Sequence, residues 1–300
     1  MVENILLKRT KKTTKYLRDL MANKEIIVAP GAYDAFSARL IEFMGFDAVY
    51  MTGFGTAASI LGYPDIGLVT MSEMLDNARR IANSVNIPVI ADADTGYGNP
   101  LNVIRTVQDY ENAGVSGLHI EDQIFPKKCG HTTGKELIPM EEMVEKIRAA
   151  KDAKRDPNFL IIARTDAIAV EGFEMALERA KQYYKAGAEM IFVEAPETME
   201  QIESIPKELK NIPLLFNWVG PGAKSPLVDL NTLRKFGYKL VIIPLASLSP
   251  AYKAIKEFLF DVKNNGVSNK LAEKMVNFSE LIDFMGFPEI NQLEKKYVTK

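Results

Sequence analysis

The sequence is poor in the residues that most often build disulfides and zinc sites, with one cysteine and two histidines in 300 residues. One cysteine cannot form a disulfide within the chain, which fits a reducing cytoplasm. The histidines are not spaced as a ligand pair, which argues against zinc. A formal net charge of -2 provides no basic face for nucleic acid. No apolar stretch suits a signal peptide or a membrane span, so we expect a cytoplasmic protein without either.

What the sequence does contain is an ordinary globular composition, 47% hydrophobic and 25% charged, arranged in a repeating pattern. Short apolar runs recur, and they are continuous rather than alternating, as in buried parallel strands. The eight runs are residues 26–29, 48–51, 88–91, 117–120, 159–163, 190–193, 213–216 and 239–243. Amphipathic segments between them, such as 71–83, 101–113 and 140–153, predict helices, several of which end at a glycine.

Strands that alternate with helices in this way predict an α/β fold, a closed (β/α)8 barrel of TIM type. An open doubly wound sheet is the competing fold. The segment Pro30-Gly31-Ala32-Tyr33-Asp34 lacks the dinucleotide-binding glycine pattern that such a sheet usually carries. We expect one barrel domain over residues 1–300, in which residues 268–300 form a C-terminal helical extension. The surface that covers this apolar tail is either its own barrel or a neighbouring subunit.

Acidic residues follow three of the predicted strands, where a barrel of this type forms its active site. Asp92 and Asp94 follow the third strand, Glu121 the fourth and Glu194 the sixth. They would repel one another without a cation, and carboxylates suit Mg²⁺ or Mn²⁺. Residues two apart on a strand face the same side, so Asp92 and Asp94 could reach one ion. Asp65 is a candidate to bind the ion through water. The alternative is that either strand-end aspartate caps the next helix.

Other strand ends carry groups suited to a carboxylate substrate. Arg164 could grip a carboxylate at two points, or it could form a salt bridge to Glu194 or Asp166. Tyr50 could accept a proton in the mouth of the barrel, or be a core tyrosine. The groups that could bind a second carboxylate are Thr52, Asn217 and the backbone N–H groups near Gly53 and Gly130.

The cysteine loop, residues 121–135, reads EDQIFPKKCGHTTGK and contains the single cysteine, Cys129. The nearby charges of Lys127, Lys128, His131 and Lys135 would favour a thiolate. His131 could orient the loop or tune the thiol. An inert buried thiol is the alternative, but the polar surroundings argue against burial. A lone cysteine beside carboxylates that could hold a metal indicates an acid–base enzyme.

These motifs resemble the isocitrate lyase/phosphoenolpyruvate mutase superfamily, and the resemblance covers nearly the whole chain. The matching segments are PGAYDAFSARL, Thr52-Gly53, Pro64-Asp65-Ile66-Gly67, DADTGYG at 92–98, Glu121-Asp122-Gln123, KKCGH at 127–131 and Ala163-Arg164-Thr165-Asp166. The KKCGH segment is similar to the gating loop of the lyase branch, whereas the mutases carry an asparagine-containing loop there.

The resemblance implies a Mg²⁺-dependent carbon–carbon lyase, a homotetramer in which the C-terminal helix is exchanged between subunits. The ion would be held by Asp92 and Asp94, with Asp65 and Glu121 nearby. The implied catalytic residues are Cys129 as general acid, Tyr50, Glu121 and His131. The implied substrate-binding residues are Thr52, Gly53, Phe54, Gly130, Arg164, Glu194 and Asn217.

The substrate is expected to be a 2-hydroxy dicarboxylate similar to 2,3-dimethylmalate, cleaved to pyruvate and a carboxylic acid. Methylisocitrate lyases resemble this chain but carry arginines for a third carboxylate, and residues 244–250 and 276–281 contain none. An unpaired buried carboxylate would be costly, although Lys224 could replace an arginine. Methylisocitrate lyase is therefore the first alternative. Oxaloacetate decarboxylation or phosphonopyruvate-type chemistry is the second, and Cys129 argues against it. If the chain were instead a non-catalytic barrel scaffold, every carboxylate at the mouth of the barrel would need a structural role.

Overall fold

The computed structural model describes residues 12–297. Residues 1–11 and 298–300, the two ends of the predicted domain, lie outside the described residues. By its internal contacts the chain divides into a barrel unit, Lys12–Leu248, and a second unit that contains the chain from Ser249 onward. We describe the two units separately, and the expectation of one domain over residues 1–300 stays a prediction.

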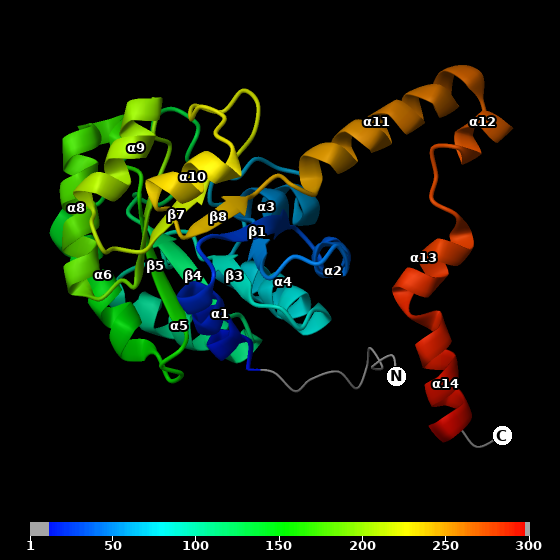
Figure 1. Cartoon of the computed structure of the whole chain (residues 1–300), viewed down its shortest axis with the longest axis horizontal. Helices are drawn as coiled ribbons and strands as arrows, with labels where there is room; N and C mark the ends of the chain where they lie inside the picture. Colours follow the sequence, from blue (N-terminus) through cyan, green and yellow to red (C-terminus); the bar gives the residue numbers. More distant parts are fainter. Residues whose placement is uncertain (1–11, 298–300) are drawn as a thin grey trace. The chain divides into compact units, whose positions relative to one another are not determined.

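Eight parallel strands close into a barrel in chain order, which confirms the predicted fold (Figure 1). The strands are β1 Ile27–Ala32, β2 Val49–Met51, β3 Val89–Asp92, β4 Gly117–Glu121, β5 Leu160–Thr165, β6 Met190–Val193, β7 Leu214–Asn217 and β8 Leu240–Ile243. The largest difference from the predicted runs is in β1, which continues through Pro30 and Gly31 to Ala32. A side chain at Gly31 would not fit, because its Cβ would lie 2.3 Å from the carbonyl oxygen of Pro244.

Helices connect the strands around the outside of the barrel (Figure 1). They are α2 Ala35–Phe43, α3 Gly53–Ile60, α4 Met71–Ser84, α5 Pro100–Ala113, α6 Met140–Ala153, α7 Ile168–Glu171, α8 Phe173–Ala186, α9 Met199–Glu208 and α10 Leu230–Phe236. Local signals fix their ends. The Asn99 side chain caps α5 by accepting from the N–H groups of Leu101 and Asn102, and Gly114 ends that helix with φ 93°.

Alternate residues of each strand point into the barrel and pack against one another. Leu160 and Ile162 of β5 and Phe192 of β6 belong to this interior cluster. Helix α1, Thr13–Asn23, adds Leu17 and Leu20 to the same cluster. Its Arg18 also donates to the carbonyl oxygens of Asn158 and Phe159, which immediately precede β5. Helix α1 therefore closes the amino-terminal end of the barrel, and the site has to lie at the other end.

The second unit is helical, as predicted for residues 268–300, up to the last described residue. It consists of α11 Leu248–Asn265, α12 Asn269–Ala272, α13 Phe278–Met285 and α14 Phe287–Tyr297. Tyr252, Ile255 and Leu259 of α11 are exposed to 66%, 57% and 58%. Within residues 12–297, no helix combines the length and apolar character that crossing a membrane requires.

Candidate active site

Polar side chains replace apolar ones at the inward positions near the carboxyl ends of the strands. Along β5 the inward residues are Leu160, Ile162 and Arg164. Along β6 they are Met190 and Phe192, and Glu194 directly follows the strand in the same alternation. The residues that this alternation places in the mouth are Tyr50, Asp92, His119, Glu121, Arg164, Glu194 and Asn217. All except Asn217, which is half-buried, are buried. The strand alternation thus gathers six of the predicted site residues, together with His119, at one end of the barrel.

Arg164 is the cation that organises this mouth. Its Nε and Nη2 donate to Oδ2 and Oδ1 of Asp166 at 2.9 and 3.0 Å. Its Nη1 lies 3.0 Å from Glu121 Oε2, and its Nη2 lies 3.7 Å from Glu194 Oε1. The guanidinium also stacks over the Phe192 ring, 5.2 Å from the ring centre. The salt bridges that were one interpretation of Arg164 are therefore present, and they fix the orientation in which it could meet a substrate carboxylate.

Asp92 and Asp94 come together in a different way from the one expected. Strand β3 ends at Asp92, and Asp94 has a left-handed φ of 46°, so the two do not share a strand face. Instead, the Asp94 N–H donates to Asp92 Oδ1 at 2.9 Å. Neither aspartate caps α5, because Asn99 does. The prediction that Asp94 shares a strand face with Asp92 was therefore wrong. A tight turn after the strand brings the two residues together, and both carboxylates are buried.

Lys127 joins two of the predicted metal-site residues, which the sequence reasoning did not anticipate. Its buried ammonium lies 2.6 Å from Asp65 Oδ1 and 2.8 Å from Asp94 Oδ1. Burial, opposed by Lys127 and reinforced by Asp92 and Asp65, raises the pKa of Asp94 to about 6. Burial also raises the pKa of Glu121 well above its ordinary value, although Arg164 opposes this. The mouth therefore holds more carboxylates than its cations neutralise.

The donor atoms of these carboxylates fit a hard divalent ion. Asp94 Oδ1 and both oxygens of Glu121 are buried and make no hydrogen bond. Asp92 Oδ2 occupies the space beside Gly53, where a Cβ would lie 2.3 Å from it. Carboxylate oxygens are the ligands that Mg²⁺ and Mn²⁺ prefer. Within residues 12–297, however, no three Asp, Glu, His or Cys side chains already converge as a ligand set. Metal binding therefore stays a proposal.

Tyr50 and His119 form a buried pair at the bottom of the mouth. Tyr50 Oη lies 2.9 Å from His119 Nε2 and donates to Asp92 Oδ2 at 3.4 Å. Burial, reinforced by Asp92, raises the pKa of Tyr50 well above its ordinary value. Burial lowers the pKa of His119, so that this interior histidine is neutral. Tyr50 is thus a neutral phenol in this environment, which opposes its role as a base; that role stays a prediction.

Three predicted substrate-binding residues form the start of α3. The Thr52 hydroxyl accepts from the Gly55 N–H at 3.2 Å and so caps the helix. Gly53 is buried at the first helical position, whereas Phe54 has 38% of its surface exposed. Thr52 therefore has a structural role, and contact of these three residues with substrate stays a prediction.

Asp122 immediately follows Glu121 but does not face the mouth. Its carboxylate accepts from Thr165 Oγ1 and Tyr183 Oη at 2.8 Å each, and from the Asp166 N–H at 2.9 Å. Arg179 Nη1 lies 3.3 Å from it. Asp122 therefore ties the end of β5 to α8 and holds Asp166 in place.

The cysteine loop lies against the mouth. His131 Nε2 is 3.4 Å from Glu194 Oε1, and its Nδ1 accepts from the Lys224 N–H at 3.2 Å. Gly130 is buried, and Cys129 is half-buried. Burial raises the pKa of the Cys129 thiol, against a lowering effect of a hydrogen bond from the His131 backbone. The expectation that nearby cations favour a thiolate was therefore wrong, and a protonated thiol suits a general acid better.

Among the described residues, most of the buried side-chain polar atoms that make no hydrogen bond lie in this mouth. Asn217 Nδ2 donates to both oxygens of Glu194 at 3.2 Å, while its Oδ1 accepts no hydrogen bond. The others in the mouth are His119 Nδ1, His131 Nε2, Asp94 Oδ1 and both oxygens of Glu121, although Lys127 and Arg164 lie close to these two carboxylates. Buried polar atoms are normally paired, so such a cluster indicates a polar ligand. This cluster marks the mouth as the candidate active site.

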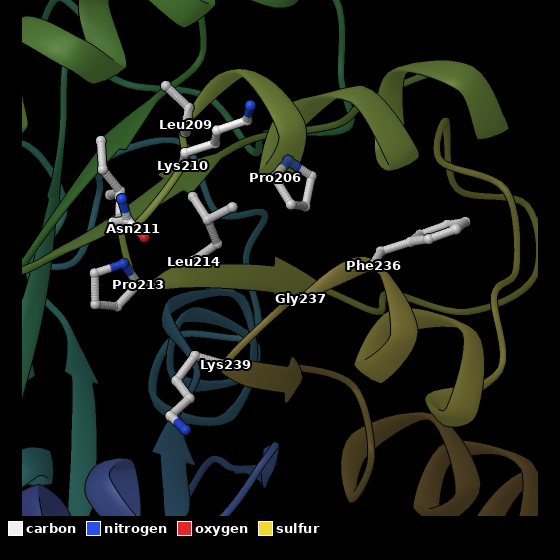
Figure 2. Close-up of a pocket in the computed structure, with 10 residues that line it drawn as sticks. Pro206, Leu209, Lys210, Asn211, Pro213, Leu214, Phe236, Gly237 and Lys239 are labelled. Atoms are coloured by element: carbon white, nitrogen blue, oxygen red, sulfur yellow. The ribbon is translucent and has the colours of Figure 1, made fainter.

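A surface pocket of about 410 Å³ lies elsewhere (Figure 2). Its lining comes from the ends of α9 and α10 and from the residues before β7 and β8, including Pro206, Lys210, Phe236 and Lys239. It is therefore at the amino-terminal ends of the strands, opposite the face where barrels of this type build active sites. We do not assign it to the site.

Comparison with known proteins agrees with this arrangement. A family model described as phosphoenolpyruvate phosphomutase matches residues 17–263. The chain belongs to the phosphoenolpyruvate mutase/isocitrate lyase superfamily. A 2,3-dimethylmalate lyase from Eubacterium barkeri is 46% identical over 96% of this chain and 99% of its own length. A 2-methylisocitrate lyase from Aeropyrum pernix is 42% identical over 95% of this chain and 91% of its own.

Solved structures of superfamily members superpose closely on the chain. An oxaloacetate acetylhydrolase with 3,3-difluorooxalacetate has a TM-score of 0.91 at 38% identity, covering 97% of this chain and 99% of that one. A 2,3-dimethylmalate lyase has a TM-score of 0.90 at 37% identity, covering 97% of each chain. A phosphonopyruvate hydrolase with oxalate and Mg²⁺ has a TM-score of 0.86 at 31% identity, covering 97% and 100%. The family and the lyase prediction are confirmed.

Proposed function

We propose that this lyase uses Mg²⁺ to cleave the C2–C3 bond of a 2-hydroxy dicarboxylate of the 2,3-dimethylmalate type. The observation that carries the proposal is the mouth itself. Arg164 is fixed there by the carboxylates of Asp166 and Glu121, and the loop that bears a protonated thiol lies against this group of charges. The relative named 2,3-dimethylmalate lyase supports this substrate class.

In the proposed reaction the hydroxyl proton leaves to the Glu121 carboxylate, whose raised pKa makes it a stronger base than an ordinary carboxylate. The C2–O bond becomes a carbonyl, and the electron pair of the C2–C3 bond passes to C3. The Cys129 thiol then donates its proton to C3, so that 2,3-dimethylmalate yields pyruvate and propionate. Bound Mg²⁺ would polarise the hydroxyl and stabilise the developing negative charge.

Other residues would hold the substrate in place for this step. Arg164 would bind one carboxylate with the N–H groups that its acidic neighbours leave free. Asn217 Oδ1 would accept a hydrogen bond from the ligand. His131 Nε2 would donate one, because Nδ1 of the same ring accepts from the Lys224 N–H. Asp92 and Asp94 would hold the ion, with Asp65 and Glu121 nearby.

Cleavage of methylisocitrate is the second candidate, and the relative from Aeropyrum pernix supports it. A tricarboxylate needs one more cation in the mouth. Residues 244–250 contain no arginine, and Ser247 of this segment donates to the Gly31 carbonyl oxygen at 2.6 Å. Lys224 lies next to the site, because its N–H donates to His131. We therefore favour the dicarboxylate, and a substrate comparison decides between them.

The test is a panel of 2,3-dimethylmalate, 2-methylisocitrate, isocitrate, citramalate and oxaloacetate with and without Mg²⁺. Release of pyruvate or glyoxylate is followed by coupled NADH oxidation with lactate dehydrogenase. We expect the highest kcat/KM with 2,3-dimethylmalate and no turnover after treatment with EDTA. A higher kcat/KM with 2-methylisocitrate would transfer the assignment to the second candidate. Turnover of none of the five would refute the proposal.

A homotetramer, as the resemblance implied, and a cytoplasmic location, as the single cysteine indicated, are part of the same proposal. The exposed apolar side chains Tyr252, Ile255 and Leu259 of α11 are consistent with coverage by another subunit. Light scattering at micromolar concentration tests the assembly.

A further inference from the structure

Lys135 is a buried cation at the end of the cysteine loop that the proposed reaction does not use. Its side chain is 1% exposed. Its Nζ lies 2.8 Å from Asp166 Oδ1 and also donates to the carbonyl oxygen of Gly130. Burial of a lysine this deep is unusual unless the ammonium is paired. Lys135 therefore joins the loop residue next to Cys129 to a residue that follows β5.

The partner of Lys135 is the carboxylate that also holds Arg164. Asp166 accepts from Arg164 through both oxygens and from Lys135 through one of them. Burial would raise the pKa of Asp166, but Arg164 and Lys135 outweigh it and hold that pKa well below its ordinary value. The Asp166 backbone is fixed in turn by Asp122. The ionised Asp166 carboxylate thus sets the orientation of Arg164 and also binds Lys135, at the end of the cysteine loop.

The backbone of the cysteine loop packs directly against Arg164 and its acidic partner Glu194. A Cβ built on Gly130 would lie 2.0 Å from Glu194 Oε1 and 2.5 Å from Arg164 Nη2. The Gly130 carbonyl is the group that Lys135 holds, and Cys129 precedes it. Loss of this hydrogen bond would free the loop at the point where it meets Arg164.

We propose that Lys135 is a positioning residue that latches the cysteine loop to Asp166, so that the thiol and the substrate-binding guanidinium are placed by one carboxylate. The proposal rests on the proposed function only for the role of Cys129 in turnover. A purely structural role for Lys135 is the alternative. It predicts a loss of stability without a specific change at the loop.

The experiment measures the rate at which iodoacetamide alkylates Cys129 in the full-length protein without substrate. Cys129 is the only cysteine in the sequence, so alkylation reports on this loop alone. Lys135→Met should raise the rate at least about tenfold, because a hydrogen bond between charged groups shifts an open–closed equilibrium by that factor or more. Loss of a positive charge near the thiol would by itself slow alkylation. An increase therefore has to come from exposure.

Lys154→Met is the matched control. Its ammonium likewise bridges a carboxylate, Glu189 at 2.9 Å, and a carbonyl oxygen, that of Pro157 at 3.2 Å. It follows α6 and lies before β5, at the other end of the barrel. We expect this variant to alkylate at the wild-type rate even where its melting temperature falls. Lys135→Arg, which keeps the charge and the donors, should restore slow alkylation.

Turnover gives a second readout. In Lys135→Met, kcat should fall about tenfold or more, and Lys135→Arg should recover most of it. Equal alkylation rates in wild type and Lys135→Met, or an equal increase in Lys154→Met, would overturn the proposal. If the wild-type chain turns over none of the substrate panel, the proposed function fails, whereas the alkylation comparison still tests the latch.

Discussion

Gly130→Ala tests whether the cysteine loop has to lie directly on Arg164 and Glu194. The added Cβ would lie 2.0 Å from Glu194 Oε1 and 2.5 Å from Arg164 Nη2, whereas ordinary contacts of this kind are about 3.4 Å or more. Neither partner can move easily, because Glu194 is held by Asn217 and Arg164 by Asp166. The loop has to retreat by about 1 Å, and such a misplacement can cost about 10²-fold in rate. We expect kcat/KM to fall by about that factor.

The assay is coupled pyruvate release with 2,3-dimethylmalate and Mg²⁺, together with the melting temperature of each variant. Gly134→Ala is the control in the same loop. Its Cβ would meet only the flexible Lys128 ammonium at 2.8 Å, and the substitution carries the additional strain of φ 75°. It should therefore lose stability without the large loss in kcat/KM. Wild-type kcat/KM in Gly130→Ala would refute the close seating of the loop.

Four further results follow from the same contacts. Cys129→Ala should lower kcat by about 10²- to 10⁴-fold, as expected for a general acid, without abolishing the Mg²⁺-dependent rise in melting temperature. Asp92→Asn should abolish that rise, and a normal Mg²⁺ shift in this variant would remove Asp92 from the proposed ion site. Because burial raises the pKa of the Cys129 thiol above the ordinary value of about 8.5, the alkylation rate should reach half its maximum above that pH, and a midpoint at or below it would contradict the shift. Asp122→Asn should lower the free energy of unfolding by about 2–4 kcal/mol in urea titrations, since an amide nitrogen in place of Oδ2 cannot accept from the buried Thr165 and Tyr183 hydroxyls.

The barrel could be predicted because its signals are local and repeated. Each strand is a short apolar run, and many helices end at a glycine, so the strands and helices can be located one by one. Because each strand of such a barrel pairs with the next one along the chain, their order then determines the pairing. The inward or outward direction of strand-end residues was also within reach of the sequence. Leu118 and Ile120 of β4 pack outward, so Glu121 has to point inward and Asp122 outward. Counting alternate positions would have separated the site carboxylate from the structural one.

Other parts of the site depend on contacts between distant segments. The alternation rule fails at Asp94, because the strand stops at Asp92 and the turn that follows has a left-handed residue. The sequence likewise gave no sign that Lys127 would lie between Asp65 and Asp94, or that Lys135 would reach Asp166, 31 residues away. Long flexible side chains in a glycine-rich loop can pair with many acids, so their partners emerge only in the folded chain.

The charges gathered in the mouth explain why two of its carboxylates, Asp94 and Glu121, have raised pKa values while Asp166 has a lowered one. Around the site, six carboxylates face three permanent cations. The carboxylates are Asp65, Asp92, Asp94, Glu121, Asp166 and Glu194, and the cations are Lys127, Lys135 and Arg164. Asp166 uses Lys135 and shares Arg164, so Asp94 and Glu121 are the groups left with raised pKa values. A substrate with two carboxylates would add negative charge to a site that already lacks positive charge. Such a site can accept a dianion only with protons or a divalent cation beside it, which is the electrostatic reason to expect metal dependence.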